Sequence, residues 1–360
     1  MPKCRRSILL ALWLGLLMAM MPLKGVAFPL SSAALPNESG SKAIRDSEFL
    51  PLFQGTREIE HGNNGAALPY LIESLEQNPT NLIALFHLGN AYLELAKNAD
   101  IAPQRSMFLR QAYQNFERVI NLNGSLTIAY FKLGKVALMA NDLDSARRYY
   151  ELGLEADPKN AALVFNLARV HDQANDKDKA MTFYRQAIEL DPTFVFAYNN
   201  LGLLYEDKKD WLAAERYYKQ ALNKDPDYTL SRINLGNLYA TMGRYGAAEK
   251  QLKVAIERDP ENEWGFLYLG NVYLKQSKYQ QAVEMYQHAV AINPEHPSLY
   301  YLMAIALSRL NRMDEAMQAG LRYVQLVPEG EFADEMKRLI LSTKLSQSRG
   351  LTVMPLGGQK

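Results

Sequence analysis

The sequence predicts an all-α fold in which antiparallel helix pairs stack into a solenoid. The first observation behind this prediction is a set of prolines spaced 34 residues apart, at Pro158, Pro192, Pro226, Pro260, Pro294 and Pro328. The second is a row of alanines with the same spacing, at Ala146, Ala180, Ala214, Ala248, Ala282 and Ala316. A fixed period of this length is the sequence signature of a repeat array.

The spacing within one repeat predicts two helices. When the proline is numbered position 32, positions 4, 7, 8 and 11 follow the i, i+3, i+4, i+7 pattern of one helix face, and positions 20, 24 and 27 form a second face. Asp-Pro pairs such as Asp191-Pro192 end the second helix, because the residue before proline is driven out of the α region. One such pair cannot bury its apolar face alone, so neighbouring pairs must stack.

This pattern resembles the tetratricopeptide repeat, a family in which each 34-residue unit is a pair of antiparallel helices. The repeat at 195–228 carries the residues of the family pattern, namely Tyr198, Leu201, Gly202, Tyr205, Ala214, Tyr218, Ala221 and Pro226. The resemblance implies a right-handed α-solenoid with a concave groove that is lined by the first helix of each pair. It also implies a non-enzymatic scaffold that binds protein partners.

We place eight repeats and a C-terminal capping helix in residues 48–346. The predicted bounds are about 48–81, 82–126, 127–160, 161–194, 195–228, 229–262, 263–296 and 297–330, with the capping helix at 331–346. Pro51 is at position 4 of the first repeat, near the expected first turn, where proline is tolerated. The second repeat is 11 residues too long around Lys97–Met107, which indicates either longer helices with a wider loop or a docking loop.

The first 27 residues have the pattern of a secretory signal peptide. Basic residues precede an apolar run from Ile8 to Met21, and small residues follow, so cleavage is expected after Ala27, with Ala33 or Ala34 as alternatives. The other interpretation is an uncleaved membrane anchor, although the run is short for a span of about 20 residues. We expect a flexible linker at 28–47 and a disordered tail at 347–360.

Charge and cysteine content narrow the class of partner and the compartment. Without residues 1–27 the basic residues fall from 40 to 36 against 39 acidic residues, a net charge of −3, so no basic excess favours nucleic acid. The only cysteine, Cys4, precedes the apolar run. An exported chain without disulfides favours a bacterial periplasmic or envelope-associated protein, and contact with a membrane is expected only if the signal segment stays uncleaved.

No catalytic motif, metal site or cofactor site is predicted. The five histidines are spread over four repeats at unrelated positions, and no Gly-rich phosphate loop or Gly-x-Ser-x-Gly motif is present. Few residues remain outside the repeats, too few for a catalytic domain. We therefore expect no enzyme activity.

The resemblance implies that positions 2, 5, 6, 9, 12 and 13 of each first helix face the groove. Asparagines recur at positions 6 and 9, at Asn90, Asn166, Asn200, Asn234, Asn237 and Asn271. Amide side chains that are exposed in the free protein could pair with the N–H and C=O groups of an extended peptide. They are similar to the asparagine ladder of O-linked N-acetylglucosamine transferases. The alternative is a local hydrogen-bonding role.

Aromatic residues are the second candidate set. Phe86, Phe131 and Phe165 occupy position 5 of consecutive repeats, where they form either an apolar strip in the groove or packing in the core. Tyr268, with Trp264 and Tyr301, gives the C-terminal half of the groove an aromatic character. Position 2 carries no cation, so the carboxylate clamp of chaperone-binding relatives is not predicted.

These observations favour a scaffold that binds an extended peptide segment in its groove, within the assembly of a cell-envelope complex. The main alternative is a glycan-binding or polysaccharide-export subunit, in which the aromatic rings would stack on sugars. A purely structural spacer would bind no groove ligand.

Overall fold

The computed structural model describes residues 42–349, and the predicted signal peptide, most of the linker and most of the tail lie outside this range. The described residues form 17 α-helices and no strand, so the all-α fold class is confirmed. Contacts between helices divide the chain into two compact units at Gln186 and Ala187, within α9. Unit 1 runs to Gln186 and unit 2 begins at Ala187.

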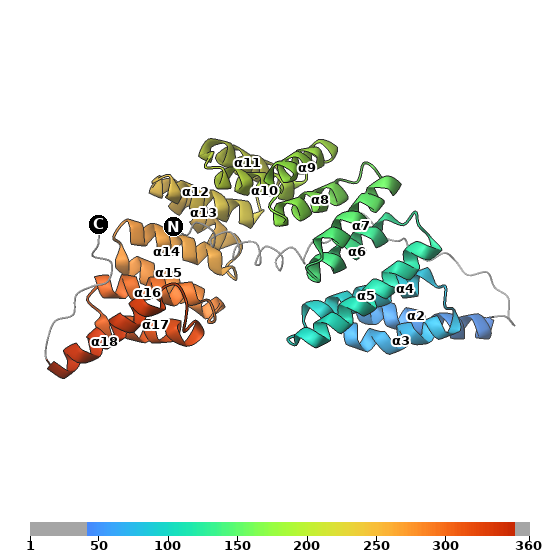
Figure 1. Ribbon diagram of the computed structural model, residues 1–360, viewed down its shortest axis with the longest axis horizontal. Helices are drawn as coiled ribbons and strands as arrows, with labels where there is room; N and C mark the ends of the chain where they lie inside the picture. The colour runs from blue at the N-terminus through green and yellow to red at the C-terminus, as the bar shows by residue number, and fades with distance from the viewer. Residues whose placement is uncertain (1–41, 350–360) are drawn as a thin grey trace. The chain divides into compact units, whose positions relative to one another are not determined.

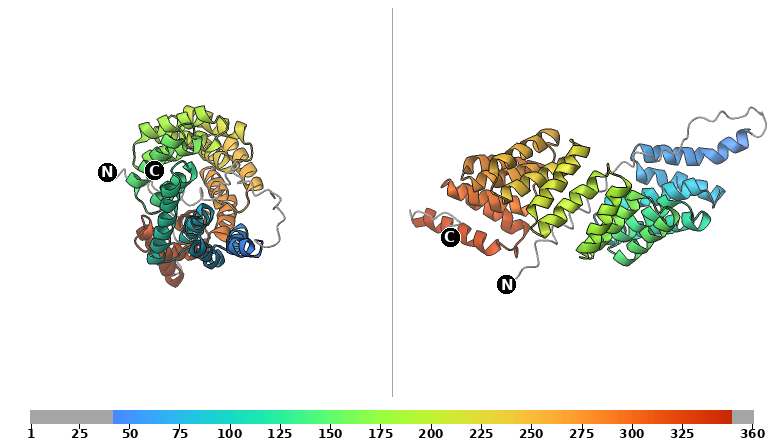
Figure 2. Two further views of the ribbon diagram at one scale, coloured as in Figure 1. Left: turned by 90° about the vertical axis from the view of Figure 1, so that its right-hand side faces the viewer. Right: turned by 90° about the horizontal axis from the view of Figure 1, so that it is seen from above.

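Each predicted repeat holds one pair of helices, and the two helices of a pair lie side by side (Figure 1). The first helices are α2 (Lys42–Glu60), α4 (Leu82–Lys97), α6 (Thr127–Met139), α8 (Ala161–Gln173), α10 (Val195–Asp207), α12 (Thr229–Thr241), α14 (Glu263–Lys275) and α16 (Pro297–Arg309). The second helices are α3 (Asn64–Gln77), α5 (Ala102–Leu122), α7 (Leu143–Ala156), α9 (Lys177–Leu190), α11 (Trp211–Lys224), α13 (Tyr245–Arg258), α15 (Tyr279–Ile292) and α17 (Met313–Leu326). Figure 2 shows the same pairing from two further directions.

The turn inside each of the six regular repeats has the same backbone form. Position 15 adopts a positive φ in every one of them, at Asn141, Asn175, Lys209, Gly243, Ser277 and Asn311. The next residue donates its N–H back to the first helix, as Asp142 does to the carbonyl of Ala137 at 2.9 Å. This left-handed residue ends the helix by satisfying its last carbonyl groups and reverses the chain for the second helix.

The recurrent glycine at position 8 makes room for the side chain at position 24. A Cβ on Gly270 would lie 2.5 Å from Cε1 of Tyr286, and one on Gly236 would lie 2.6 Å from Cγ of Leu252. Both of these neighbours are fully buried. The close contact of the glycine is therefore with the large residue at position 24, one turn beyond the alanine at position 20 of the second helix.

The 11 additional residues of the second repeat lengthen its helices. α4 has 16 residues and α5 has 21, compared with 13 and 14 in the regular repeats, and the turn of four residues between them is one longer than the others. Pro103 lies in the first turn of α5, where no N–H is lost. The interpretation as longer helices is therefore correct, and the docking-loop interpretation is not.

The two ends of the array differ in extent from the predicted bounds. α2 begins at Lys42, inside the predicted linker, so Pro51 lies in the helix interior and not in its first turn. α18 (Ala333–Arg349) begins later than the predicted capping helix and extends into the predicted tail. Met336 and Leu339 of α18 are buried against α17, which covers the apolar edge of the last repeat.

Candidate binding face of the first helices

The phenylalanines at position 5 pack inside their own repeats. The ring of Phe86 lies 5.7 Å from that of Phe116, and the ring of Phe165 lies 5.5 Å from that of Tyr184. Phe131 is placed in the same way, 6.3 Å from Tyr150. Phe165 is only 1% exposed, whereas Phe86 and Phe131 are half-buried. Position 5 therefore contributes mainly to the core, and an exposed apolar strip is not formed at Phe165.

The asparagines at position 6 are less exposed than we expected. Asn166 is 8% exposed and Asn200 is 7% exposed. Asn166 donates to the carbonyl of Ala162 at 2.7 Å and accepts from Arg169 at 3.2 Å, both on its own helix α8. The expectation of largely exposed amides is therefore wrong for these two residues.

A buried hydrogen-bond network in unit 2 includes the third asparagine of this row. Asn199 is completely buried on α10, and its Oδ1 accepts from Ser231 Oγ at 2.9 Å and from Asn234 Nδ2 at 3.0 Å on α12. These bonds join two consecutive repeats. The sequence analysis missed Asn199 at position 5 and Ser231 at position 3. Both positions are apolar in most other repeats, so a polar residue there was a usable signal.

The asparagines at position 9 fall into two groups. Asn271 accepts a hydrogen bond from Tyr286 at 2.8 Å inside its own repeat, which is a structural role. The amides of Asn90 on α4 and Asn237 on α12 form no hydrogen bond with any other residue in the described part of the chain, and both side chains are half-buried. Of the predicted asparagines, these two are the ones left with hydrogen-bonding capacity for a ligand.

The predicted aromatic residues of unit 2 contact other rings. Tyr268 is half-buried, with its ring 5.8 Å from that of Trp264. The ring of Tyr301 stacks on Phe332 at 4.0 Å, and its hydroxyl donates to Glu335 at 3.2 Å. The chain itself therefore covers Tyr301, which weakens the hypothesis that this ring stacks on a sugar.

Glu206 of α10 is a buried carboxyl group in unit 2. Tyr218 donates its hydroxyl to Glu206 Oε1 at 2.6 Å. Burial raises the pKa of Glu206 to about 7, the hydrogen bond from Tyr218 opposes this shift, and the charge of Asp207 adds to it. Burial, together with the charge of Glu206, also raises the pKa of Tyr268 to about 12.

Unit 1 holds a cluster of three lysines and one glutamate on the first helices α4 and α6, which we call the lysine cluster. Its members are Glu94 and Lys97 on α4 and Lys132 and Lys135 on α6. Lys97 forms an ion pair with Glu94 and is only 16% exposed. The Lys132 ammonium lies 5.9 Å from the ring centroid of Phe86. Neither Lys132 nor Lys135 has an ion-pair partner within residues 42–349.

The surroundings of these two lysines disfavour their charged forms. Burial lowers the pKa of Lys132 to about 8, an effect that Glu94 opposes and Lys97 reinforces. Burial also lowers the pKa of Lys135 to about 8, with further contributions from the charges of Lys97 and Lys132. The cluster thus contains one carboxylate for three ammonium groups. Strongly shifted groups with an unbalanced charge are typical of functional sites.

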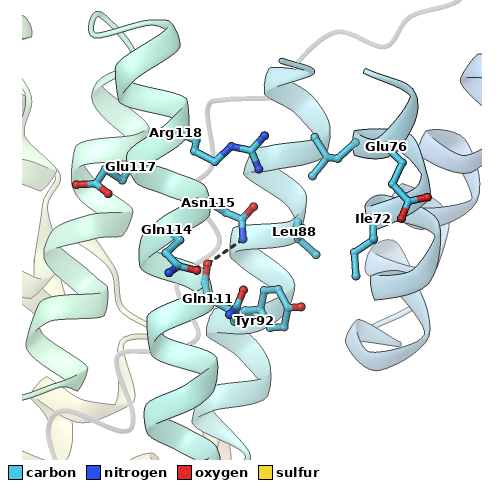
Figure 3. Close-up of a pocket in the computed structure, with 10 residues that line it drawn as sticks. Ile72, Glu76, Leu88, Tyr92, Gln111, Gln114, Asn115, Glu117 and Arg118 are labelled. Atoms are coloured by element: carbon cyan, nitrogen blue, oxygen red, sulfur yellow. Dashed lines mark hydrogen bonds between the residues drawn. The ribbon is translucent and has the colours of Figure 1, made fainter. Parts of the chain in front are cut away.

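A groove of about 540 Å³ lies elsewhere in unit 1, between α3, α4 and α5 (Figure 3). Leu75 and Leu88 contribute apolar surface to it, and Ile72 is 40% exposed at its side. On α5, Asn115 donates to the carbonyl of Gln111 at 2.8 Å. None of the predicted site residues lines this groove, which is formed by the second helices α3 and α5 together with the first helix α4.

Residues 42–349 contain no group of three or more His, Cys, Asp or Glu side chains that could hold a metal ion. In the same part of the chain, no helix has the length and apolar character needed to cross a membrane.

Comparison with known proteins identifies the family. Three profiles described as tetratricopeptide repeat match the sequence, one over residues 54–100, 131–193 and 267–331, another over 206–265 and a third over 183–216. Together they match more than half of the chain. The chain belongs to the tetratricopeptide repeat family. This fold is a scaffold for protein–protein interaction, and proteins that consist of such repeats are generally non-enzymatic.

Individual relatives are similar over parts of their length. The tetratricopeptide repeat and J domain-containing co-chaperone DNJ1 of Fusarium oxysporum is 28% identical over 113 residues, which are 31% of this chain and 19% of the co-chaperone. Yeast Tom70 is similar in structure with a TM-score of 0.61 and 16% identity, over 90% of this chain and 68% of Tom70. PilW, a type IV pilus biogenesis factor, has a TM-score of 0.54 and 21% identity, over 59% of this chain and 98% of PilW. At these identities the two structures show the fold alone.

Proposed function

We propose that this protein binds an extended segment of a partner protein along the first helices of unit 1, on the face formed by α4, α6 and α8. The observation that carries the proposal is the presence of polar groups without protein partners on two consecutive first helices. Asn90 on α4 has a free amide, and Lys132 and Lys135 on α6 have no ion pair in the described part of the chain. Leaving such groups unpaired costs free energy unless a ligand satisfies them.

The chemistry of this face suits a polypeptide better than a small metabolite. The side chain of Asn90 carries an amide, the kind of group that pairs with a peptide backbone, and its buried Oδ1 has no partner within the described residues. The half-buried ring of Phe86 lies beside the Lys132 side chain and offers apolar contact close to the polar groups. Regularly spaced helices present such groups at intervals along a line, which favours an extended ligand.

Replacing Asn90 by alanine tests the proposed binding face of the first helices. No protein hydrogen bond is lost, so the free energy of unfolding should change by less than about 0.5 kcal/mol. A 12-residue peptide selected from a random library on the full chain should bind the variant about two- to tenfold more weakly, the equivalent of one net hydrogen bond. Fluorescence anisotropy with the labelled peptide measures this change.

Asn271→Ala is the matched control, because Asn271 has the same position in its repeat but accepts a hydrogen bond from Tyr286. We expect this control to lose stability and to keep its affinity for the peptide. If the library yields no binder at all, or if Asn90→Ala binds every selected peptide as tightly as the wild type, the proposed function is wrong.

We also propose that the protein acts outside the cytoplasm, in the assembly of an envelope complex. The support comes from the sequence, in which basic residues, an apolar run and small residues up to Ala27 have the order of a cleaved export signal. A partner would then be an envelope protein with a segment free to extend along the helices.

Export is tested by fusing residues 1–40 to a reporter enzyme that is active only outside the cytoplasm. We expect reporter activity, and amino-terminal sequencing of the full-length protein after expression in bacteria should begin at Phe28. An intact product that starts at Met1 and stays in the cytosol would exclude both export and an envelope partner.

A further inference from the structure

We infer that the partner segment bound on this face of unit 1 is acidic, and that the lysine cluster of α4 and α6 recognises its carboxylates. This inference rests on the function proposed above and names the class of ligand for the same site. It uses Lys97, Lys132 and Lys135 as the recognising groups and Glu94 as the internal carboxylate with which the ligand competes.

The longer first helix of the second repeat creates the cluster. α4 continues three residues beyond the length of a regular first helix, and Lys97 is its last residue. In the regular repeats the corresponding position lies in the turn between the two helices. The additional residues therefore hold Lys97 on a rigid helix beside its partner Glu94, and the charges of both act on Lys132 and Lys135 of the next first helix.

The balance of charge around the cluster is positive. Besides Glu94, Glu60 of unit 1 acts on His87 of α4. His87 itself also feels the charge of Lys132, and burial lowers its pKa, so it is neutral at pH 7. Arg169, on the following first helix α8, bonds to the amide of Asn166 and not to a carboxylate. An acidic ligand would supply the missing negative charge.

Desolvation makes the arrangement selective for an anion. The lysines are already partly removed from water, so an added carboxylate meets less competition from solvent than it would at an exposed lysine. Bringing a carboxylate close also restores the pKa of Lys132 and Lys135 toward the ordinary lysine value. Binding should therefore take up protons near pH 8, where an exposed lysine would not titrate.

The small number of basic side chains at this site favours a protein segment over nucleic acid as the ligand. The whole sequence carries a net charge of only +1, and the lysine cluster itself consists of three ammonium groups and one carboxylate on α4 and α6. Nucleic-acid binding depends on a basic surface that contacts many phosphates. Phe86, whose ring lies beside Lys132, and Asn90, one turn further along α4, instead suit the apolar and amide groups of a peptide.

The test measures binding of two labelled 12-residue peptides to the full chain by fluorescence anisotropy at pH 7. One alternates Glu and Ala, and the other alternates Gln and Ala. We expect the Glu peptide to bind at least about tenfold more tightly, and the difference to shrink as salt is raised. The double variant Lys132→Met, Lys135→Met should remove this preference. Methionine keeps the apolar stem, so the denaturation midpoint should not fall.

Two further variants separate recognition from folding. The double variant Lys159→Met, Lys250→Met removes the same charge from exposed sites and should bind the Glu peptide as the wild type does. Glu94→Gln removes the competing carboxylate and should bind the Glu peptide several-fold more tightly at pH 6.5, where Lys132 and Lys135 are charged. A gain in affinity cannot arise from damage to the fold.

The dependence on pH gives an independent readout. Affinity for the Glu peptide should fall about tenfold between pH 7 and pH 9.5, since Lys132 and Lys135 lose their protons over that range and the ligand carboxylates do not titrate. Lys135→Arg keeps its charge and should reduce this fall. Binding that is unaffected over this range would overturn the assignment of these lysines.

The remaining outcomes distinguish the binding of extended peptides from the preference for acidic peptides. If library-selected peptides bind but the Glu and Gln peptides bind equally, the acidic preference is wrong and the binding of extended segments stands. If no peptide binds, the proposed function itself fails. If a 12-nucleotide oligothymidylate binds more tightly than the Glu peptide and competes with it, the cluster recognises nucleic acid and the inference is overturned.

Discussion

Replacing Asn199 by alanine is expected to lower the free energy of unfolding by about 2–4 kcal/mol. Asn199 is completely buried between α10 and α12, where its Oδ1 accepts from both Ser231 and Asn234. The alanine variant would leave the buried hydroxyl of Ser231 and the half-buried amide of Asn234 without their acceptor, and an unsatisfied buried group costs about 1–3 kcal/mol. The two bonds cross from one repeat to the next, so the variant weakens the interface that holds the array together.

Denaturant unfolding followed by circular dichroism measures this loss. Asn223→Ala, at an exposed position on α11, is the matched control and should leave the midpoint unchanged. In the double variant Asn199→Ala, Ser231→Ala one of the orphaned donors is also removed, so its cost should be smaller than the sum of the two single costs. Equal stability of Asn199→Ala and wild type would mean that water replaces the network without penalty.

The fold was predictable because its determinants are local and repeated. The prolines that follow the second helices, the small residues at positions 8 and 20 and the apolar rows recur in successive repeats. The ends of the array were predicted less well, because α2 and α18 have no neighbouring copy to set their register. The sequence located the 11 additional residues of the second repeat, but it could not decide whether they lengthen the helices or form a loop. Pro103 is compatible both with a loop and with a helix N-terminus.

The site was less predictable, because burial depends on contacts between repeats. Position 6 was expected to be exposed, but the same position holds a nearly buried Asn166 on α8 and a half-buried Lys132 on α6. The lysine cluster combines different positions of two helices, one of them in the extra turn of α4, so no fixed spacing marks it. The asparagine row marks polar positions of the first helices, but several of its members bond within the protein, which the spacing alone could not reveal.

Glu206→Gln is expected to raise the free energy of unfolding by about 1–3 kcal/mol at pH 8 and to have little effect at pH 4.5. The pKa of Glu206 is about 7 in the folded protein and near 4.5 in the unfolded chain. Between these values the folded state binds more protons, so wild-type stability falls as the pH rises from about 4.5 to 7 and is then constant. Glutamine cannot ionise, so the variant avoids the cost of a buried charge and still accepts the hydrogen bond from Tyr218.

Denaturant titrations at pH 5, 6, 7 and 8 measure how the free energy of unfolding of each variant changes with pH. Glu215→Gln on α11 is the matched control, because the pKa of Glu215 is lowered: hydrogen bonds from Lys219 and Tyr239 outweigh the opposing effect of its burial. Its stabilising contribution is present above the ordinary carboxyl pKa and is lost as the pH falls, so this control should destabilise the protein at pH 8. Tyr218→Phe should extend the decline of stability to higher pH, since Glu206 then loses the donor that favours its charged form. A wild-type stability that is constant from pH 5 to 8, and unchanged by Glu206→Gln, would show that this carboxyl group is ionised throughout.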